Sequence, residues 1–352
     1  MTFAPVTHVL PLTTVRRERL LPLPGRIVVR KGQKVSATDV IAESNLAPQH
    51  LLLDVVRGLG IATRKVDDYI HRQAGDHLDE GDLIAGPVGW PKRVVRAPAA
   101  GKIVLIRNGR VLYEVEKPLS QLRAGLPGTV ITLIGDRGVE IENSGALVQG
   151  VWGNGVIDAG LMRVLISKPE DVLTADRVDV GLRGAVVLAG YCGEASILQT
   201  AAEIPLRGLI LSSMASALVP LAARMPYPIM ILEGFGLHPM NSAAYNLLTT
   251  NNQREIAVNA ECYDRYSGTR PEAFIPLPVS GKSAEPRDAT LFAPNQRVRV
   301  IRAPHNSQVG MLVALRLEME LFASGIRAPA AEVRLESGAV VILPLANLEV
   351  LE

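Results

Sequence analysis

The sequence predicts a mixed β and α/β protein built from three domains. Three observations carry this prediction: a β pattern that occurs twice in the first third of the chain, short apolar runs that alternate with helix-length segments at 184–248, and a final block at 296–352 that is all β in pattern. Because 352 residues exceed the usual size of one domain, we expect domains at 1–124, 125–275 and 291–352, with a linker at 276–290.

The repeated pattern organises the first domain. It reads RKGQKVSATDVIA at 30–42, and a clearer second copy begins GDHLDEGDLIA at 75–85 and runs on to residue 103. Six positions agree: Gly32, Val35, Asp39, Val40, Ile41 and Ala42 correspond to Gly75, Leu78, Asp82, Leu83, Ile84 and Ala85. A glycine turn, an apolar residue, a polar turn and a short apolar strand predict two related antiparallel β units.

This repeat, closed by residues 97–103, resembles the barrel-sandwich hybrid, the fold of biotinyl and lipoyl carrier domains. With the inserted segment 48–73 it is also similar to the corresponding part of glutamate mutase L accessory proteins. In carrier domains, a lysine flanked by methionine or acidic residues sits at the tip of a hairpin. Lys92 lies near the equivalent hairpin, but its neighbours Trp90, Pro91 and Arg93 depart from that motif. We therefore expect no covalent cofactor.

Composition favours a folded cytoplasmic protein. Apolar residues make up 48% of the chain, which is ample for buried cores. The first 20 residues lack the features of a signal peptide, and the longest nearly uncharged stretch, 208–223, is too short and polar for a membrane span. Cys192 and Cys262 stand far apart without CxxC spacing, so we expect two free, buried thiols in a reducing compartment and no metal site.

A small net charge hides an asymmetry between domains. Residues 1–124 carry 19 Lys and Arg against 12 Asp and Glu, a charge of +7, whereas residues 125–275 carry −5 and the last domain is neutral. The basic excess predicts a candidate basic surface made of Arg16, Arg17, Arg19, Arg26, Arg30, Lys31, Lys92, Arg93 and Arg96. Such a surface can meet RNA, an acidic partner, or the acidic domain of a neighbouring copy, and ordinary solvated charge explains it equally well.

Local patterns predict several elements. Apolar residues at helical spacing predict a helix over 51–59 that Gly58 and Gly60 end, and Thr63 is expected to cap a second helix. The dipeptide Asn108-Gly109 predicts a type I′ hairpin between strands at 102–107 and 110–116. Strands are expected at 129–134 and 146–151, with turns at 136–138 and 143–145.

The rhythm at 184–248 predicts a three-layer α/β domain with a parallel sheet, because apolar strands at 185–189, 208–211 and 228–232 alternate with helical segments. Small or polar residues follow each strand, and the carboxyl ends of parallel strands meet at one edge. They define a candidate ligand crevice: Gly190, Tyr191, Gly193, Ser212, Ser213, Glu233, Gly234 and His238. The alternative is structural: turns for the glycines, helix caps for the serines, and a buried partner for Glu233.

The last block resembles a KOW element in an SH3-like barrel, through RVRVIRAP at 297–304 and GMLVA at 310–314. Ala303 and Ser307 stand where KOW sequences usually have glycines, so that only Gly310 keeps the tight-turn residue. The resemblance implies contact with RNA or with proteins. The block is neutral and its single aromatic residue is Phe322, which argues against nucleic acid.

We therefore predict a non-enzymatic binding or assembly protein, a scaffold that self-associates through the basic first domain of one copy and the acidic middle domain of another. No catalytic motif is present in the sequence, and no catalytic residue or cofactor is predicted. Two alternatives stay open. One is an RNA-associated or transcription-associated KOW protein, and the other is a small-molecule enzyme or sensor that uses the candidate ligand crevice.

Overall fold

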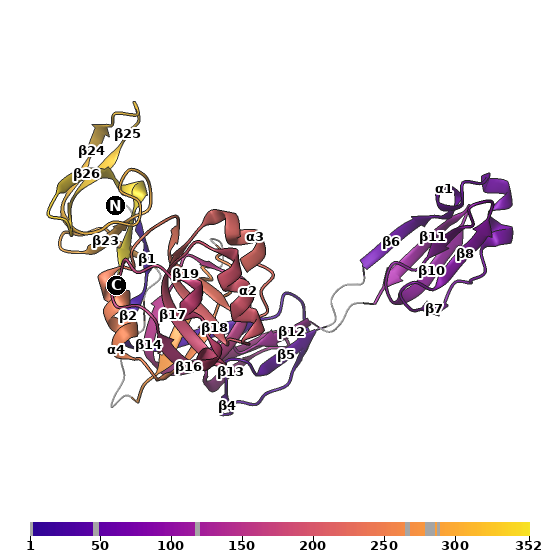
Figure 1. The fold of residues 1–352 in the computed structure, drawn as a ribbon, viewed down its shortest axis with the longest axis horizontal. Coiled ribbons are helices and arrows are strands. Elements are labelled where there is room, and N and C mark those ends of the chain that lie inside the picture. Colours follow the sequence, from indigo (N-terminus) through magenta and orange to yellow (C-terminus); the bar gives the residue numbers. More distant parts are fainter. Residues whose placement is uncertain (1–2, 45–48, 117–119, 265–267, 279–285, 287–288) are drawn as a thin grey trace. The chain divides into compact units, whose positions relative to one another are not determined.

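The computed structural model describes residues 3–44, 49–116, 120–264, 268–278, 286 and 289–352 (Figure 1). The protein is mainly β, with 49% of residues in strands and 14% in helices, and one of its sheets contains parallel strands. The chain divides into two compact units, which are described separately. The larger contains Met1–Leu20, Val28–Ile41 and Arg123–Glu352, and the smaller contains Leu21–Ile27 and Ala42–Leu122.

This division differs from the domain boundaries expected from the sequence, because the first strands pair with distant segments. β1 (Phe3–Thr7) pairs with β27 (Leu348–Leu351), and β2 (Val9–Leu20) pairs along its length with β14 (Gly138–Gln149). Residues 117–119, shortly before the expected boundary between 124 and 125, and parts of the expected linker at 276–290 lie outside the described residues.

An eleven-stranded sheet forms the centre of the larger unit. Besides β2 and β14 it contains β4 (Lys34–Val35), β13 (Gly128–Ile134), β15 (Trp152–Gly153), β16 (Ile157–Val164), β17 (Ala185–Cys192), β18 (Gly208–Met214), β19 (Ile229–Phe235), β20 (Glu255–Asn259) and β21 (Glu272–Pro276). Strands β16, β17, β18 and β19 are parallel neighbours, so the predicted parallel strands are present, in a sheet whose other pairs are antiparallel.

Both faces of β17, β18 and β19 are buried, and alternate residues contribute to two cores. One core joins Val187, Leu209 and Ile229 to α2 (Ala195–Glu203) and α3 (Val219–Ala222). The other joins Val186, Ile210 and Met230 to α4 (Ser242–Thr250) and to apolar residues of β2 and β14. The uninterrupted apolar character of the strands follows from this double burial.

The C-terminal sheet has seven strands in the order β22-β1-β27-β23-β24-β25-β26. Besides β1 and β27 these are β22 (Ala289–Leu291), β23 (Arg297–Val300), β24 (Val309–Leu321), β25 (Arg327–Leu335) and β26 (Val340–Pro344). Their inward side chains, such as Leu312, Val333 and Val350, make a separate core. A turn that contains Ser337 and Gly338 joins β25 to β26, and Gly338 has the positive φ that favours glycine there.

The smaller unit contains a four-stranded antiparallel sheet, a two-stranded sheet and α1 (Val55–Leu59). The four-stranded sheet consists of β6 (Gln49–Asp54), β7 (His77–Leu78), β10 (Gly101–Arg107) and β11 (Arg110–Val115). The two-stranded sheet consists of β8 (Leu83–Val88) and β9 (Arg93–Arg96). A further sheet holds β3 (Arg26–Ile27), β5 (Val40–Ser44) and β12 (Ser120–Arg123). The 3-10 turns of the chain lie at Thr63–Lys65, Asp67–Tyr69, Ala175–Arg177, Val180–Leu182, Ser216–Leu218 and Leu345–Asn347.

The two copies of the sequence repeat make the same backbone contacts, one set in each unit. Gly32 N–H donates to Val130 O at 2.7 Å, and Gly75 N–H donates to Ile103 O at 2.7 Å. The aspartate position of the repeat, Asp39 in the first copy and Asp82 in the second, matches too. Ala124 N–H donates to Asp39 O at 2.9 Å, and Ala97 N–H donates to Asp82 O at 2.8 Å.

The repeat therefore extends to segments that the sequence comparison did not align: 124–130 in the first copy corresponds to 97–103 in the second. The second copy lies in the chain between the two halves of the first. In the second copy, Lys92 is exposed in the turn between β8 and β9, beside Trp90, whose surface is 93% exposed.

Some local predictions are confirmed and others are wrong. Asn108 and Gly109 both have positive φ between β10 and β11, as a type I′ hairpin requires. The helix predicted over 51–59 begins only at Val55, because 51–54 pair with β11, and Thr63 makes no side-chain cap. The turn predicted at 143–145 lies inside β14, where Gly145 lets the backbone of Ile275 approach closely.

Candidate functional site

The candidate ligand crevice predicted at the parallel strands lies at their carboxyl ends. Tyr191 pairs with Ser213 across β17 and β18, and Ser213 pairs with Gly234 across β18 and β19. Gly190 and Ser212 precede them, and Gly193 and His238 follow. The structure thus brings the predicted residues to one edge, and whether they bind a ligand depends on what already occupies their polar atoms.

Glu233 is buried and fully engaged by the protein. Its Oε1 accepts hydrogen bonds from the backbone N–H of Asn241 at 2.9 Å and from Asn241 Nδ2 at 2.6 Å, and its Oε2 accepts from Arg299 Nη1 at 2.8 Å. Asn241 is the N-cap of α4, so this carboxylate holds the start of the helix. The structural interpretation of Glu233 therefore agrees with these contacts better than a ligand role does.

Arg299, on β23, is 2% exposed and links the parallel sheet to the C-terminal sheet. Besides Glu233 it contacts the Leu232 carbonyl at 2.9 Å, and its Nε donates to Glu349 on β27 at 2.5 Å. Burial alone would lower the pKa of Arg299, but Glu349 and Glu233 together raise it above its ordinary value. The guanidinium therefore stays charged, and we call Glu233, Arg299 and Glu349 the buried triad.

Two further residues extend the buried triad toward the N-terminal strand. Thr7 Oγ1, on β1, donates to Glu349 Oε2 at 2.9 Å. Arg270 Nη1 donates to Thr7 Oγ1 at 3.0 Å and lies 3.8 Å from Glu349 Oε2. Charges of opposite sign therefore alternate along this cluster, which is the arrangement that buried ions need.

Ser213 and His238 of the crevice also have partners. Ser213 Oγ donates to the His238 carbonyl at 2.8 Å and accepts from the His238 N–H at 3.1 Å. His238 Nε2 lies 3.0 Å from the Phe235 carbonyl, and Ser307 Oγ donates to the Glu233 carbonyl at 3.2 Å. A cavity of about 390 Å³ lies beside these contacts, lined by parts of 237–241, 306–309 and 335–337.

Of the glycines at the crevice, Gly190 has a clear structural use. The carbonyl oxygen of Asp171 accepts from Tyr191 N–H at 2.9 Å, and a Cβ on Gly190 would overlap that oxygen. Gly190 therefore allows segment 171–173 to lie against the end of β17. A Cβ on Gly193 would meet only the ring of Tyr191, a side chain that can move.

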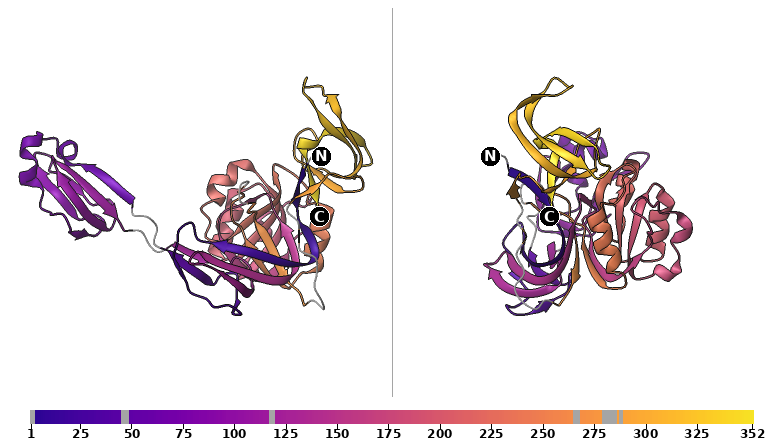
Figure 2. Two further views of the ribbon diagram at one scale, coloured as in Figure 1. Left: turned by 180° about the vertical axis from the view of Figure 1, so that it is seen from behind. Right: turned by 90° about the vertical axis from the view of Figure 1, so that its left-hand side faces the viewer.

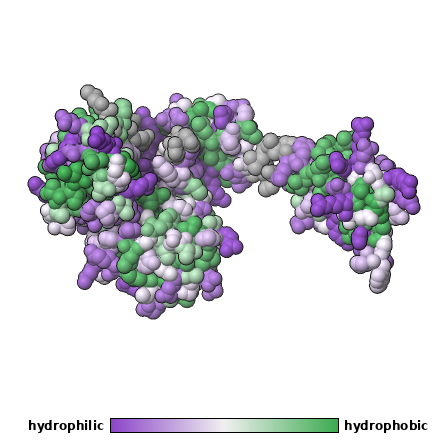
Figure 3. Space-filling view, turned by 90° about the horizontal axis from the view of Figure 1, so that it is seen from above, coloured by the Kyte–Doolittle hydropathy of each residue, from purple (hydrophilic) through white to green (hydrophobic). Residues whose placement is uncertain are grey.

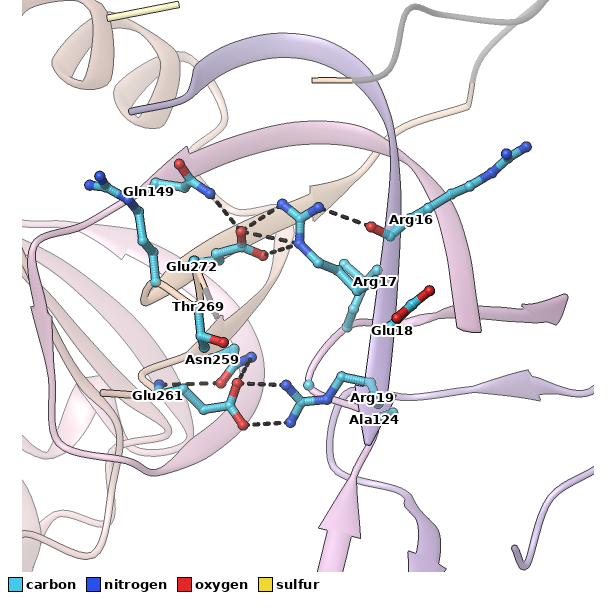
Figure 4. A pocket seen from close by; sticks show the side chains of 14 residues that line it. Arg16, Arg17, Glu18, Arg19, Ala124, Gln149, Asn259, Glu261, Thr269 and Glu272 are labelled. Atoms are coloured by element: carbon cyan, nitrogen blue, oxygen red, sulfur yellow. Dashed lines mark hydrogen bonds and ion pairs between the residues drawn. The ribbon is translucent and has the colours of Figure 1, made fainter. Parts of the chain in front are cut away.

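A second cavity, of about 270 Å³, opens beside β2 (Figure 4). Arg17 and Arg19 point from β2 toward Glu272 and Glu261, whereas the Arg16 side chain extends away. Arg17 Nη2 donates to Glu272 at 2.7 Å, and Arg19 donates through both terminal nitrogens to Glu261 at 2.5 and 2.6 Å. Two amides complete the walls: Gln149 binds Glu272, and Asn259 binds Glu261.

These contacts explain the state of Glu261. Burial would raise the pKa of Glu261, but the hydrogen bonds and charge of Arg19, with the amide of Asn259, lower it below its ordinary value. A carboxylate held ionised in this way is a poor general acid or base near neutral pH. The arginines and carboxylates of the cavity wall pair with one another, so these ion pairs chiefly hold β2 against β21 and the end of β20.

The state of Glu261 gives a prediction about acid stability. A group whose pKa is lower in the folded state stabilises the fold above its unfolded pKa, about 4.3 for glutamate, and this stabilisation is lost as the pH falls through the folded pKa. Glu261→Gln should therefore destabilise the protein by about 1–3 kcal/mol at pH 7, and its difference from wild type should shrink at pH 3. Urea unfolding at the two pH values measures this.

The matched control is Glu142→Gln, which removes an exposed partner of Arg16. It should change the free energy of unfolding by less than about 1 kcal/mol at either pH. An equal effect of Glu261→Gln at both pH values would contradict the assigned ionisation.

The candidate basic surface is divided between the two units. Arg16, Arg17, Arg19, Arg30 and Lys31 belong to the larger, and Arg26, Lys92, Arg93 and Arg96 to the smaller. Several are neutralised locally: Arg16 binds Glu142, Arg17 binds Glu272, Arg19 binds Glu261, and Arg26 lies 3.5 Å from Glu43. The RNA interpretation stays a prediction.

The two cysteines differ in exposure. Cys192 is buried as expected, and burial raises the pKa of its thiol to about 11. Cys262 is exposed, so the expectation of two buried thiols is wrong for this residue, which lies just beyond β20 at the surface.

Across the described ranges, no three His, Cys, Asp or Glu side chains gather as a metal site would require. No helix there is long and apolar enough to cross a membrane.

The most exposed apolar feature of the C-terminal sheet is the end of the β24–β25 hairpin, which we call the ribbon (residues 316–329). It projects past the other strands of that sheet (Figures 1 and 2). Leu317, Met319 and Leu321 are 63%, 66% and 64% exposed. Apolar colouring reaches the surface on this part of the molecule, at the left of Figure 3.

Sequence reasoning missed both the buried contacts of Arg299 and the exposed apolar row of the ribbon. Arg299 stands in the strand sequence RVRV at 297–300, and the alternation of arginine and valine gives no sign that this second arginine points into the core. The ribbon did carry a signal, since LRLEMEL at 315–321 alternates apolar and charged residues in the way of a strand with one apolar face.

Comparison with known proteins identifies no family. A scan against protein-family models finds no match, and a search of curated proteins finds none with significant similarity. The resemblances to barrel-sandwich hybrids, glutamate mutase L accessory proteins and KOW elements therefore remain predictions.

Proposed function

We propose that this protein is a non-enzymatic assembly protein, a scaffold that associates with other protein chains through the ribbon. The observation that carries this proposal is the row Leu317, Met319 and Leu321, three large apolar side chains on one strand, each more than 60% exposed. A two-stranded ribbon is marginally stable by itself in water, and exposed apolar rows of this kind commonly mark protein contacts.

The condition of the two cavities supports a non-enzymatic function. In the crevice, Glu233, Ser213 and His238 bond to the protein itself, and in the cavity beside β2 the carboxylates of Glu261 and Glu272 are paired with arginines. Side chains committed in this way would have to break internal bonds before they bound a substrate.

The proposal includes the finer fold assignment. We assign the repeat to two nested copies of a barrel-sandwich hybrid without a carrier lysine, the central segment to a three-layer α/β domain, and the C-terminal strands to a KOW-like barrel. The shared hydrogen bonds of the two copies support the first assignment. The double burial of β17, β18 and β19 supports the second, and the antiparallel order of β23 to β26 supports the third.

Sedimentation velocity of the full chain tests the association. We expect wild type to self-associate at tens of micromolar, roughly the range of a weak specific contact. Leu317→Glu with Met319→Glu should weaken this about 100-fold or more, because each substitution removes an apolar side chain worth about 1.5–3 kcal/mol when buried. Moderate salt should leave association largely intact, whereas contact between basic and acidic domains would weaken with salt.

The control is Val180→Glu, at a side chain that is 75% exposed elsewhere on the larger unit. It should sediment as wild type does. A wild-type chain that stays monomeric at these concentrations, or a double variant that associates equally well, would show that the ribbon is not the assembly surface.

A further inference from the structure

We infer that the ribbon binds a second copy of this chain, and that the two β24 strands pair antiparallel, edge to edge, about a twofold axis at Leu317. This inference rests on the proposed function and names the partner and the register of that contact. Three features of β24 carry it: an open edge, an apolar face, and a sequence that is complementary to itself in one register.

The open edge begins where β23 ends. Val309 and Met311 of β24 pair with β23, and Leu312 still exchanges backbone hydrogen bonds with 295–296. From residue 313 to 321, no strand of the described chain lies on that edge. The opposite edge pairs with β25 at 314–316 and 320–321, with register shifts between 312 and 314 and between 316 and 320. An unpaired edge presents free backbone donors and acceptors in a row, and another strand can satisfy them.

The apolar face continues the core-facing side of the strand. Leu315 packs partly against the C-terminal core, and the exposed Leu317, Met319 and Leu321 follow it at every second position of the strand. The strand is therefore longer than the core that it covers. A second β24 on the open edge would place an equal apolar row beside this one and extend the sheet across the pair.

Among antiparallel registers centred on residues 315 to 319, only the one centred on Leu317 sets opposite charges against each other and no like charges. With Leu317 opposite Leu317 of the second copy, Leu315 faces Met319 and Arg316 faces Glu318, so opposite charges meet on the polar side. Centring the pair on Arg316, Glu318 or Met319 places like charges opposite one another, which is destabilising. A shift by one residue would set the apolar face of one strand against the polar face of the other.

Charge sets the register of this contact and apolar burial supplies its affinity. Arg316 already binds Glu332 and, at 3.0 Å, Glu320 on its own chain. Glu318 is exposed and has no ion pair in the part of the chain that the structure describes. Arg316 of the second copy would therefore pair with Glu318, a carboxylate that the described residues of its own chain leave without an ion pair.

Cysteine cross-linking tests the register. In a Cys262→Ser background, which removes the exposed native thiol, Leu317→Cys places two cysteines across the axis at a Cα separation of about 4.5–5.5 Å, within reach of a disulfide. Leu321→Cys, at equal exposure, would lie about 27 Å from its counterpart, eight residues apart along an extended strand. We expect covalent dimer to form from Leu317→Cys at least about tenfold faster.

The outcomes separate this inference from the proposed function. Equal or absent cross-linking of both variants, in a chain whose association is still lost in Leu317→Glu with Met319→Glu, would overturn the register but leave the ribbon as the assembly surface. A wild-type chain that never associates would overturn both. Preferential cross-linking at 317 supports the pairing.

Discussion

Arg299→Ala is expected to destabilise the larger unit by about 3–5 kcal/mol, because it leaves two buried carboxylates without their shared cation. Glu233 and Glu349 are each 6% exposed or less at the side chain, and both accept from this one guanidinium. Removing the charges together should cost less than removing one. Arg299→Met with Glu233→Gln and Glu349→Gln should therefore recover part of the loss.

The measurement is urea unfolding followed by the fluorescence of Trp152. Only two tryptophans are present, so Trp90→Phe leaves Trp152 as the reporter, and Trp152 packs edge-on against Phe235 in the larger unit. Arg16→Ala, which breaks an exposed pair, is the control and should cost less than about 1 kcal/mol. If Arg299→Ala costs no more than this control, the triad does not hold the two sheets together.

Gly190→Ala is expected to cost about 3 kcal/mol or more, the upper part of the range for overpacking. The new methyl group would overlap the Asp171 carbonyl oxygen, which belongs to the backbone and is itself bonded to Tyr191 N–H at 2.9 Å. Relief requires segment 171–173 to leave the edge of β17.

Gly193→Ala is the matched control, since its methyl group would meet only the ring of Tyr191. We expect it to cost less than about 1 kcal/mol. Equal unfolding midpoints for the two variants would mean that the close approach of the Asp171 carbonyl does not require glycine at 190. The result would then favour a ligand role for this glycine.

The elements predicted best were those that local sequence determines. The apolar runs at 185–189, 208–211 and 228–232 are buried on both faces. A strand buried on both faces needs consecutive apolar residues, and each run shows them without reference to the rest of the chain. The dipeptide Asn108-Gly109 likewise dictates its own backbone geometry. Both predictions needed no knowledge of distant partners.

The predictions that failed depended on partners far away in the chain. Residues 51–54 have helical spacing, but pairing with β11 makes them a strand, so tertiary contact overrides local pattern. Residues 143–145 have turn composition, but β2 and β21 flank them on both edges and keep the chain extended.

The candidate crevice shows the same limit. Sequence placed Ser213, Glu233 and His238 at one edge of the sheet, and they do lie there. It could not reveal that Arg299, 66 residues beyond Glu233, supplies a buried cation to this carboxylate. The first strand likewise joins the C-terminal sheet through contacts between residues more than 300 positions apart, which periodicity does not report.

The central claim, that the ribbon is the assembly surface, is tested most directly by hydrogen–deuterium exchange at two protein concentrations. We expect that the amides of 313–321 that face the open edge exchange slowly at about 100 micromolar and much faster at about 1 micromolar, while amides of the buried strand β18 stay protected at both. Exchange over 313–321 that does not depend on concentration would contradict it.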